Sequence, residues 1–102
     1  VAQAFAHARQ TFGEVHGVVN LVGSILLKPA HLTRDEEWQQ TLSLNLNTAF
    51  YAVREAVKAL TDGGSIVLVS TAAARVGLAN HEAVAAAKGG VIGLTLSAAA
   101  TY

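Results

Sequence analysis

A histidine, a glutamate and a lysine within one short segment are the side chains best placed to do chemistry in this sequence. His81 and Glu82 precede a run of small and apolar residues, and Lys88 follows that run. An imidazole transfers protons near neutral pH, and His81 lies one helical turn before Val84, so it can face the same cleft. His81 and Glu82 are not a zinc motif, because the fourth residue after His81 is Ala85. No metal site is therefore expected.

Each of these side chains also has an ordinary structural interpretation. His81 is then an exposed histidine at a loop–helix junction. Glu82 complements the helix dipole, and Lys88 is a solvated charge near the start of a helix. The three remaining histidines are scattered along the chain and are interpreted as surface residues: His7, His16 and His31.

Two further polar residues stand out because of their apolar surroundings. Asn45 lies in an otherwise apolar stretch, and a buried amide must find hydrogen-bond partners, so Asn45 has a structural task whatever else it does. Thr71 follows an apolar run, where its hydroxyl can satisfy backbone groups at a strand end.

The elements that position these residues follow an alternating pattern. Residues 17–23 and 65–70 are short apolar runs that predict strands buried on both faces, as in a parallel sheet. A helix ending at Gly13 precedes the first strand, a helix through residues 38–60 separates the strands, and a helix over residues 82–102 follows. A strand, helix and strand of this kind form a right-handed βαβ unit, with helices expected on both faces of the sheet.

The helix starts and faces are also predicted. Thr33 and Glu36 fit a capping box that opens a helix, which breaks or bends and resumes at Trp38. Asn80 is the expected N-cap of the last helix. Helical spacing predicts one apolar face on the middle helix, formed by Trp38, Leu42, Leu46, Phe50, Val53 and Val57.

Four segments, in order and spacing, resemble the short-chain dehydrogenase/reductase family. Residues 12–23 are similar to the approach to the family's Asn-Asn-Ala-Gly strand end. Residues 44–47 resemble the helix that carries the active-site asparagine, and residues 64–71 resemble the strand that ends at the catalytic serine. Residues 80–95 resemble the helix with the Tyr-x-x-x-Lys signature. The resemblance implies an α/β fold with a partial Rossmann-like, doubly wound parallel sheet in the order α-β-α-β-α.

Roles pass to this sequence by that resemblance, residue by residue. Asn45, Thr71 and Lys88 take the catalytic positions, with Ser70 as the fallback for Thr71 if the loop register shifts. Asn20, Gly23 and Lys88 take positions that bind the cofactor, NAD or NADP. The tyrosine position is occupied by Val84, and His81 is its speculative replacement as the acid.

Because Val84 occupies the tyrosine position, membership of the family does not by itself imply catalytic activity. In the family, hydride moves between nicotinamide and a carbonyl carbon while the tyrosine supplies the proton, and valine cannot donate one. The glycines of residues 89–93 lie inside a helix and follow no strand, so they are not a dinucleotide-binding fingerprint. Residues 1–102 are thus expected to be the central fragment of a single Rossmann-like domain, without independent catalysis. The alternative is a pseudoenzyme or an assembly module that forms homo-oligomers through helices 38–60 and 82–102.

Composition limits the other classes of function. Seven basic residues balance seven acidic ones without a basic run, which argues against nucleic acid as a partner. Apolar residues make up 52% of the chain and no apolar run approaches the length of a membrane span, which indicates a core-forming protein outside the membrane. There is no cysteine, which excludes disulfides and thiolate metal sites. A cytoplasmic location is the default expectation.

Overall fold

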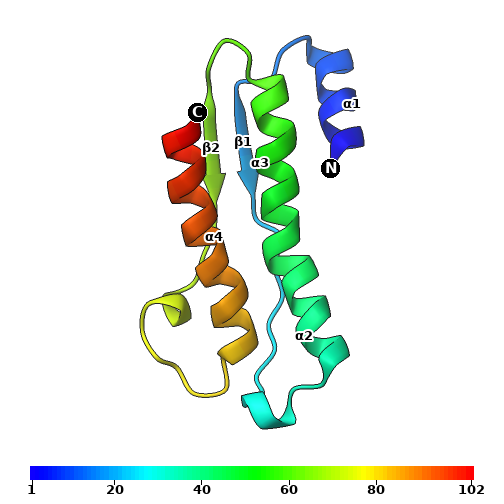
Figure 1. Cartoon of the computed structure of the whole chain (residues 1–102). Coiled ribbons are helices and arrows are strands. Elements are labelled where there is room, and N and C mark those ends of the chain that lie inside the picture. Colours follow the sequence, from blue (N-terminus) through cyan, green and yellow to red (C-terminus); the bar gives the residue numbers. More distant parts are fainter.

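The computed structural model describes all residues 1–102 and has the order helix, strand, helix, strand, helix (Figure 1). The outer elements are α1 (Ala2–Phe12), β1 (Gly17–Asn20), β2 (Ser65–Leu68) and α4 (Glu82–Thr101). The segment between the strands holds a 3-10 turn (Ala30–Leu32), α2 (Asp35–Leu42), a π-helical turn (Ser43–Asn47) and α3 (Thr48–Ala59). The predicted α/β class and order of elements are confirmed.

The two strands pair in parallel, with Val18 opposite Ile66 and Asn20 opposite Leu68. Parallel strands were predicted, but not this register, and both strands end earlier than expected. After Asn20 the strand pairing ends, and the Asn20 side chain accepts a hydrogen bond from the Val22 N–H (3.3 Å), as in an Asx-turn. The carboxyl ends of β1 and β2 therefore lie side by side, and the chain leaves the sheet there.

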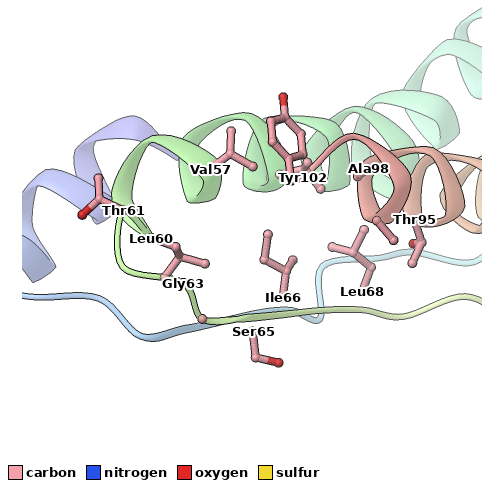
Figure 2. Close-up of a pocket in the computed structure, with 13 residues that line it drawn as sticks. Val57, Leu60, Thr61, Gly63, Ser65, Ile66, Leu68, Thr95, Ala98 and Tyr102 are labelled. Atoms are coloured by element: carbon pink, nitrogen blue, oxygen red, sulfur yellow. The ribbon is translucent and has the colours of Figure 1, made fainter.

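Only one face of the sheet is covered, so the prediction that both strands are buried on both faces is wrong. Val19 and Val67 alternate with the covered residues and are 60% and 48% exposed. The expectation of helices on both faces fails for the same reason, since α3 and α4 lie over the same face of the strands (Figure 2). Nothing within residues 1–102 covers the other face.

The core lies mainly between the helices. On the rod formed by α2, the π-helical turn and α3, the buried side chains are Thr41, Asn45, Ala49, Ala52, Val53 and Ala56. The predicted apolar face is wrong at Trp38 and Phe50, which are 37% and 47% exposed. The contact with α4 favours small side chains because the helices approach closely: a Cβ on Gly90 would lie 3.0 Å from the Leu46 side chain.

The start of α2 differs from the predicted capping box by one residue. Arg34 precedes the helix, and its N–H donates to Glu37 Oε1 (3.1 Å), so Glu37 takes the role expected of Glu36. The Thr33 hydroxyl instead donates to the Pro29 carbonyl (3.0 Å) and closes the preceding 3-10 turn. The helix also runs through Trp38 without a break and changes only at the π-helical turn.

Of the other two predicted capping residues, one is confirmed and one is wrong. Gly13 ends α1 as predicted, with a left-handed φ of 88° and its N–H donating to the Arg9 carbonyl. Asn80 is not the N-cap of α4, because His81 occupies that position. Asn80 instead adopts a φ of 64°, a conformation that asparagine tolerates better than most residues.

The molecule is an elongated slab of 48 × 25 × 17 Å (Figure 1). Its radius of gyration, 15.2 Å, exceeds the ~13 Å of a compact domain of this length. By length and composition alone α4 is long and apolar enough to cross a membrane, with a mean hydropathy of 1.5 in its most apolar window. In this structure α4 packs on α2, α3 and the π-helical turn, and its buried residues are Ala83, Val84, Ala87, Lys88 and Val91.

Candidate functional site

The Lys88 side chain joins the carboxyl ends of both strands. Its ammonium donates to the Val22 carbonyl after β1 (3.3 Å) and to the Val69 carbonyl after β2 (3.0 Å). Lys88 is only 9% exposed, although its side chain carries a charge and the rest of α4 is mostly uncharged. The structure thus places this predicted residue at the edge of the sheet where ligands bind in open α/β folds.

Asn45 is fully buried in the π-helical turn, and all its side-chain hydrogen bonds are made. Nδ2 donates to the Ser24 hydroxyl (2.9 Å) and to the Thr41 carbonyl (2.9 Å), while Oδ1 accepts from the Ser24 N–H (3.0 Å). Only this orientation of the amide satisfies both ends. Single π-helical turns occur often at functional sites.

Gly23 lies against both of these residues. A Cβ at Gly23 would come within 3.1 Å of Asn45 Oδ1 and 3.4 Å of Lys88 Nζ. Three of the residues singled out in the sequence, Gly23, Asn45 and Lys88, therefore meet in one place. We call these three residues the strand-end site.

The remaining predicted residues have local hydrogen-bond partners. The Thr71 hydroxyl oxygen accepts from the Ala73 N–H (3.3 Å) and caps the 3-10 turn Ala72–Ala74. The Ser70 hydroxyl donates to the Lys88 carbonyl (2.7 Å), which fastens β2 to α4. The remaining cofactor candidate, Asn20, forms the turn after β1 already described.

The acid candidates lie at the start of α4. The His81 Nδ1 atom pairs with the Ala79 carbonyl (2.7 Å), so the ring is bonded to its own loop. Val84, one turn before Lys88, is an apolar residue that is only 6% exposed. Glu82, expected to complement the helix dipole, also accepts a hydrogen bond from the Ala30 N–H and so ties the loop after β1 to α4.

Burial lowers the pKa of Lys88, because the charged form loses water. Its partners are carbonyl oxygens, and the four ion pairs of the chain involve other residues. An ammonium has three hydrogens, and two are directed at carbonyls. The third makes no hydrogen bond within the chain.

Sequence reasoning did not find Ser24, which holds both ends of the Asn45 amide. The only signal was its position directly after Gly23. Nor did it find a cavity of about 590 Å³, which opens between α3, β2 and the end of α4 beside Ile66, Val57 and Tyr102 (Figure 2). This cavity lies at the amino end of β2, opposite the strand-end site.

Comparison with known proteins adds the family. The sequence model described as enoyl-(acyl carrier protein) reductase matches residues 1–102. The short-chain dehydrogenase/reductase ABA4 of Pyricularia oryzae is 39% identical over 92 residues, which cover 86% of this chain and 34% of that protein. The chain belongs to the short-chain dehydrogenase/reductase family. The resemblance carried by the four sequence segments is thereby confirmed.

Other members of the family agree in sequence and in fold. A hydroxynaphthalene reductase-like protein Arp2 of Metarhizium brunneum is 35% identical, over 95% of this chain and 37% of its own. A 3beta-hydroxysteroid dehydrogenase of Mediterraneibacter gnavus is 35% identical, over 100% and 38%. A crystal structure described as that of a short-chain dehydrogenase/reductase from Burkholderia xenovorans superposes with a TM-score of 0.91 at 30% identity, over 99% of this chain and 41% of that one. The chain spans about a third of the length of these curated relatives, and its partial sheet has the Rossmann-like arrangement of the family.

Proposed function

We propose that residues 1–102 form the central part of an NAD(P)-dependent oxidoreductase that transfers hydride between nicotinamide and a carbonyl or alcohol carbon. The observation that carries this proposal is the strand-end site. A buried ammonium, a buried amide and a glycine meet where both parallel strands end. This is the edge at which nucleotides bind in open α/β sheets.

The residues of this site fit a nicotinamide nucleotide. Gly23 has no side chain where the loop after β1 passes the ammonium, and a Cβ there would crowd Asn45 and Lys88. The third hydrogen of Lys88 is available to bind ribose hydroxyls. The hydrogen of the Thr71 hydroxyl is available to orient a carbonyl oxygen, because the Thr71 oxygen is used as an acceptor. The bound cofactor would supply or accept the hydride.

The proton is the missing part of this chemistry. Val84 stands where the family has its tyrosine, and a buried valine cannot supply a proton to a carbonyl oxygen. A positioned proton donor contributes about 10²–10⁴-fold to a rate. We therefore propose that carbonyl reduction is weak or absent, as in a pseudoenzyme, although cofactor binding at Lys88 is retained.

The decisive experiment restores the phenol. In the protein expressed from the complete reading frame around these residues, Val84→Tyr should raise carbonyl reduction by about 10²–10⁴-fold. The rate is measured as NADH or NADPH oxidation over a panel of ketones and aldehydes. Val84→Phe is the matched control, since it adds the ring without the hydroxyl. Equal rates for both variants would show that the rest of the site is not arranged for catalysis.

Activity of the unaltered protein would point to a substitute acid, and His81 is the candidate. If His81 is that acid, its pairing with the Ala79 carbonyl must break in the working enzyme. His81→Ala then lowers the rate at neutral pH. An unchanged rate in His81→Ala eliminates this idea.

A second candidate function is assembly of identical chains through the long helices. The outer side of the rod exposes Phe50 and Tyr51, and α4 exposes Leu96, which is 68% exposed. The Arg54 guanidinium lies 5.7 Å from the Phe50 ring centre and 5.1 Å from that of Tyr51, so these exposed rings are held in place. Fixed aromatic side chains of this kind favour contact with another protein surface.

A further inference from the structure

Ser24 and Asn45 form a reciprocal pair that the strand-end site depends on. The Ser24 N–H donates to Asn45 Oδ1, and the Ser24 hydroxyl accepts from Asn45 Nδ2. One residue of the loop after β1 therefore binds both ends of one amide. We call this pair the Ser24–Asn45 clamp.

The clamp is connected to Lys88 through two residues of backbone. Gly23 separates Ser24 from Val22, and the Val22 carbonyl accepts from the Lys88 ammonium. Gly23 has no side chain of its own to fix its position, and the contact from Lys88 to Val22 is longer than that to Val69, 3.3 against 3.0 Å. The position of the Val22 carbonyl is thus set from two sides, by the clamp on Ser24 and by the Asn20 side chain, which accepts from the Val22 N–H.

We propose that Ser24 is a positioning residue, whose clamp on Asn45 holds the Val22 carbonyl against the Lys88 ammonium. Ser24 touches no reacting atom and acts through its neighbours. The effect on the position of Lys88 is a property of this chain and goes beyond the proposed function. Only its consequence for hydride transfer rests on that function.

The test measures the titration of Lys88 by NMR in Ser24→Ala. The substitution removes one of the two acceptors of Asn45 Nδ2, so we expect the Asn45 side-chain amide protons to exchange with water about tenfold faster. The loop after β1 then loosens and admits water, and the pKa of Lys88 rises toward that of an ordinary lysine, because burial is what lowers it. No acidic side chain is paired with Lys88: on α4 Glu82 binds the Ala30 N–H, and on α2 Glu37 binds Lys28 and Arg34.

Two variants separate positioning from general stability. Ser24→Thr keeps the hydroxyl and should restore the titration of Lys88. Thr41→Val removes a hydroxyl that bonds to the Glu37 carbonyl in the same helix, but it leaves the clamp intact. It should lower the melting temperature without moving the titration of Lys88.

Several results would overturn the proposal. The first is an unchanged Lys88 titration in folded Ser24→Ala, and the second is an equal change in Thr41→Val. If Ser24→Ala does not fold, Ser24→Cys replaces the hydroxyl with a weak acceptor of similar size, and the same titration decides. Unfolding of both variants would make Ser24 a residue of general stability and would end its assignment as a positioning residue. Failure of the Val84→Tyr experiment leaves all these outcomes unaffected.

Discussion

Gly23 is a residue at which one added methyl group would crowd two hydrogen-bonded side chains. Its neighbours are the Asn45 amide, which three hydrogen bonds hold in place, and the Lys88 ammonium, which two hold. Neither neighbour can move without breaking hydrogen bonds. The requirement for glycine here is steric.

We expect Gly23→Ala to destabilise the fold by about 1–3 kcal/mol, as other overpacked positions do. The new Cβ would lie 3.1 Å from Asn45 Oδ1. Urea denaturation measures the loss. Gly77→Ala is the control, since a Cβ at Gly77 meets nothing within 4 Å. Equal stability of the two variants would contradict the crowding.

At the residue scale, the sequence predicts which polar side chains are buried better than it predicts which partners they bind. Asn45 could be predicted because a polar side chain among apolar ones must find partners. Family resemblance adds Lys88, but neither source shows that its partners are carbonyls of two different strands. The clamp by Ser24 could not be predicted, because it depends on the path of a loop that carries no strong local signal.

At the scale of elements, the loop after β1 is fastened to α2 by a charge cluster. The Lys28 ammonium lies 2.8 Å from Glu37 Oε2, and the Arg34 guanidinium lies 3.3 Å from Oε1. The hydrogen bond from Lys28, together with those from the Arg34 backbone and side chain, lowers the pKa of Glu37 from 4.5 to about 2.

This cluster predicts a loss of stability in acid. A depressed carboxyl pKa contributes stability that is fully present above 4.5 and is lost as the pH falls toward about 2. Melting temperatures measured across that range should fall, and Glu37→Gln should flatten the fall. Glu36→Gln, an exposed neighbour, should leave it unchanged. The same slope in both variants would place the acid sensitivity elsewhere.

Two of the three glycines of α4, Gly90 and Gly93, are predicted to respond differently to alanine. Alanine favours a helix interior over glycine by about 1 kcal/mol, and a Cβ at Gly93 meets nothing within 4 Å, so Gly93→Ala should stabilise. At Gly90 the Cβ would lie 3.0 Å from both Leu46 methyl carbons, so Gly90→Ala should lose that gain or more. Thermal unfolding compares them, and a stabilising Gly90→Ala would mean that Leu46 can move aside.

The order of the elements could be predicted from alternating apolar runs. Which face of each strand or helix is buried could not be predicted. The strands were predicted as buried on both faces from composition alone, and composition cannot say whether a covering layer lies within the chain. The predicted apolar face of the rod is wrong at Trp38 and Phe50, which are exposed. Close contact between the rod and α4 selects alanine over larger apolar side chains. Helix starts shifted by one residue, since several polar residues compete for each cap.

At the scale of the whole molecule, exposed apolar side chains predict self-association. We expect sedimentation at micromolar concentrations to show dimers or larger species, because Phe50 and Tyr51 are 47% and 39% exposed on the rod. Phe50→Asp should shift the protein toward monomer, whereas Gln39→Asp, an exposed change on α2, should not. A monomeric unaltered chain would contradict the assembly function.

The bond from Lys88 to the Val22 carbonyl joins residues 66 positions apart in the sequence. During synthesis, β1 must therefore wait until α4 has left the ribosome before the strand-end site can close. Contacts of such long range form slowly, because the entropy of loop closure is lost before the bond is gained. The turns of the rod form from near neighbours and can precede them. Refolding should thus recover helix content before the Lys88 environment, and the strand-end site should be the last part of the fold to close.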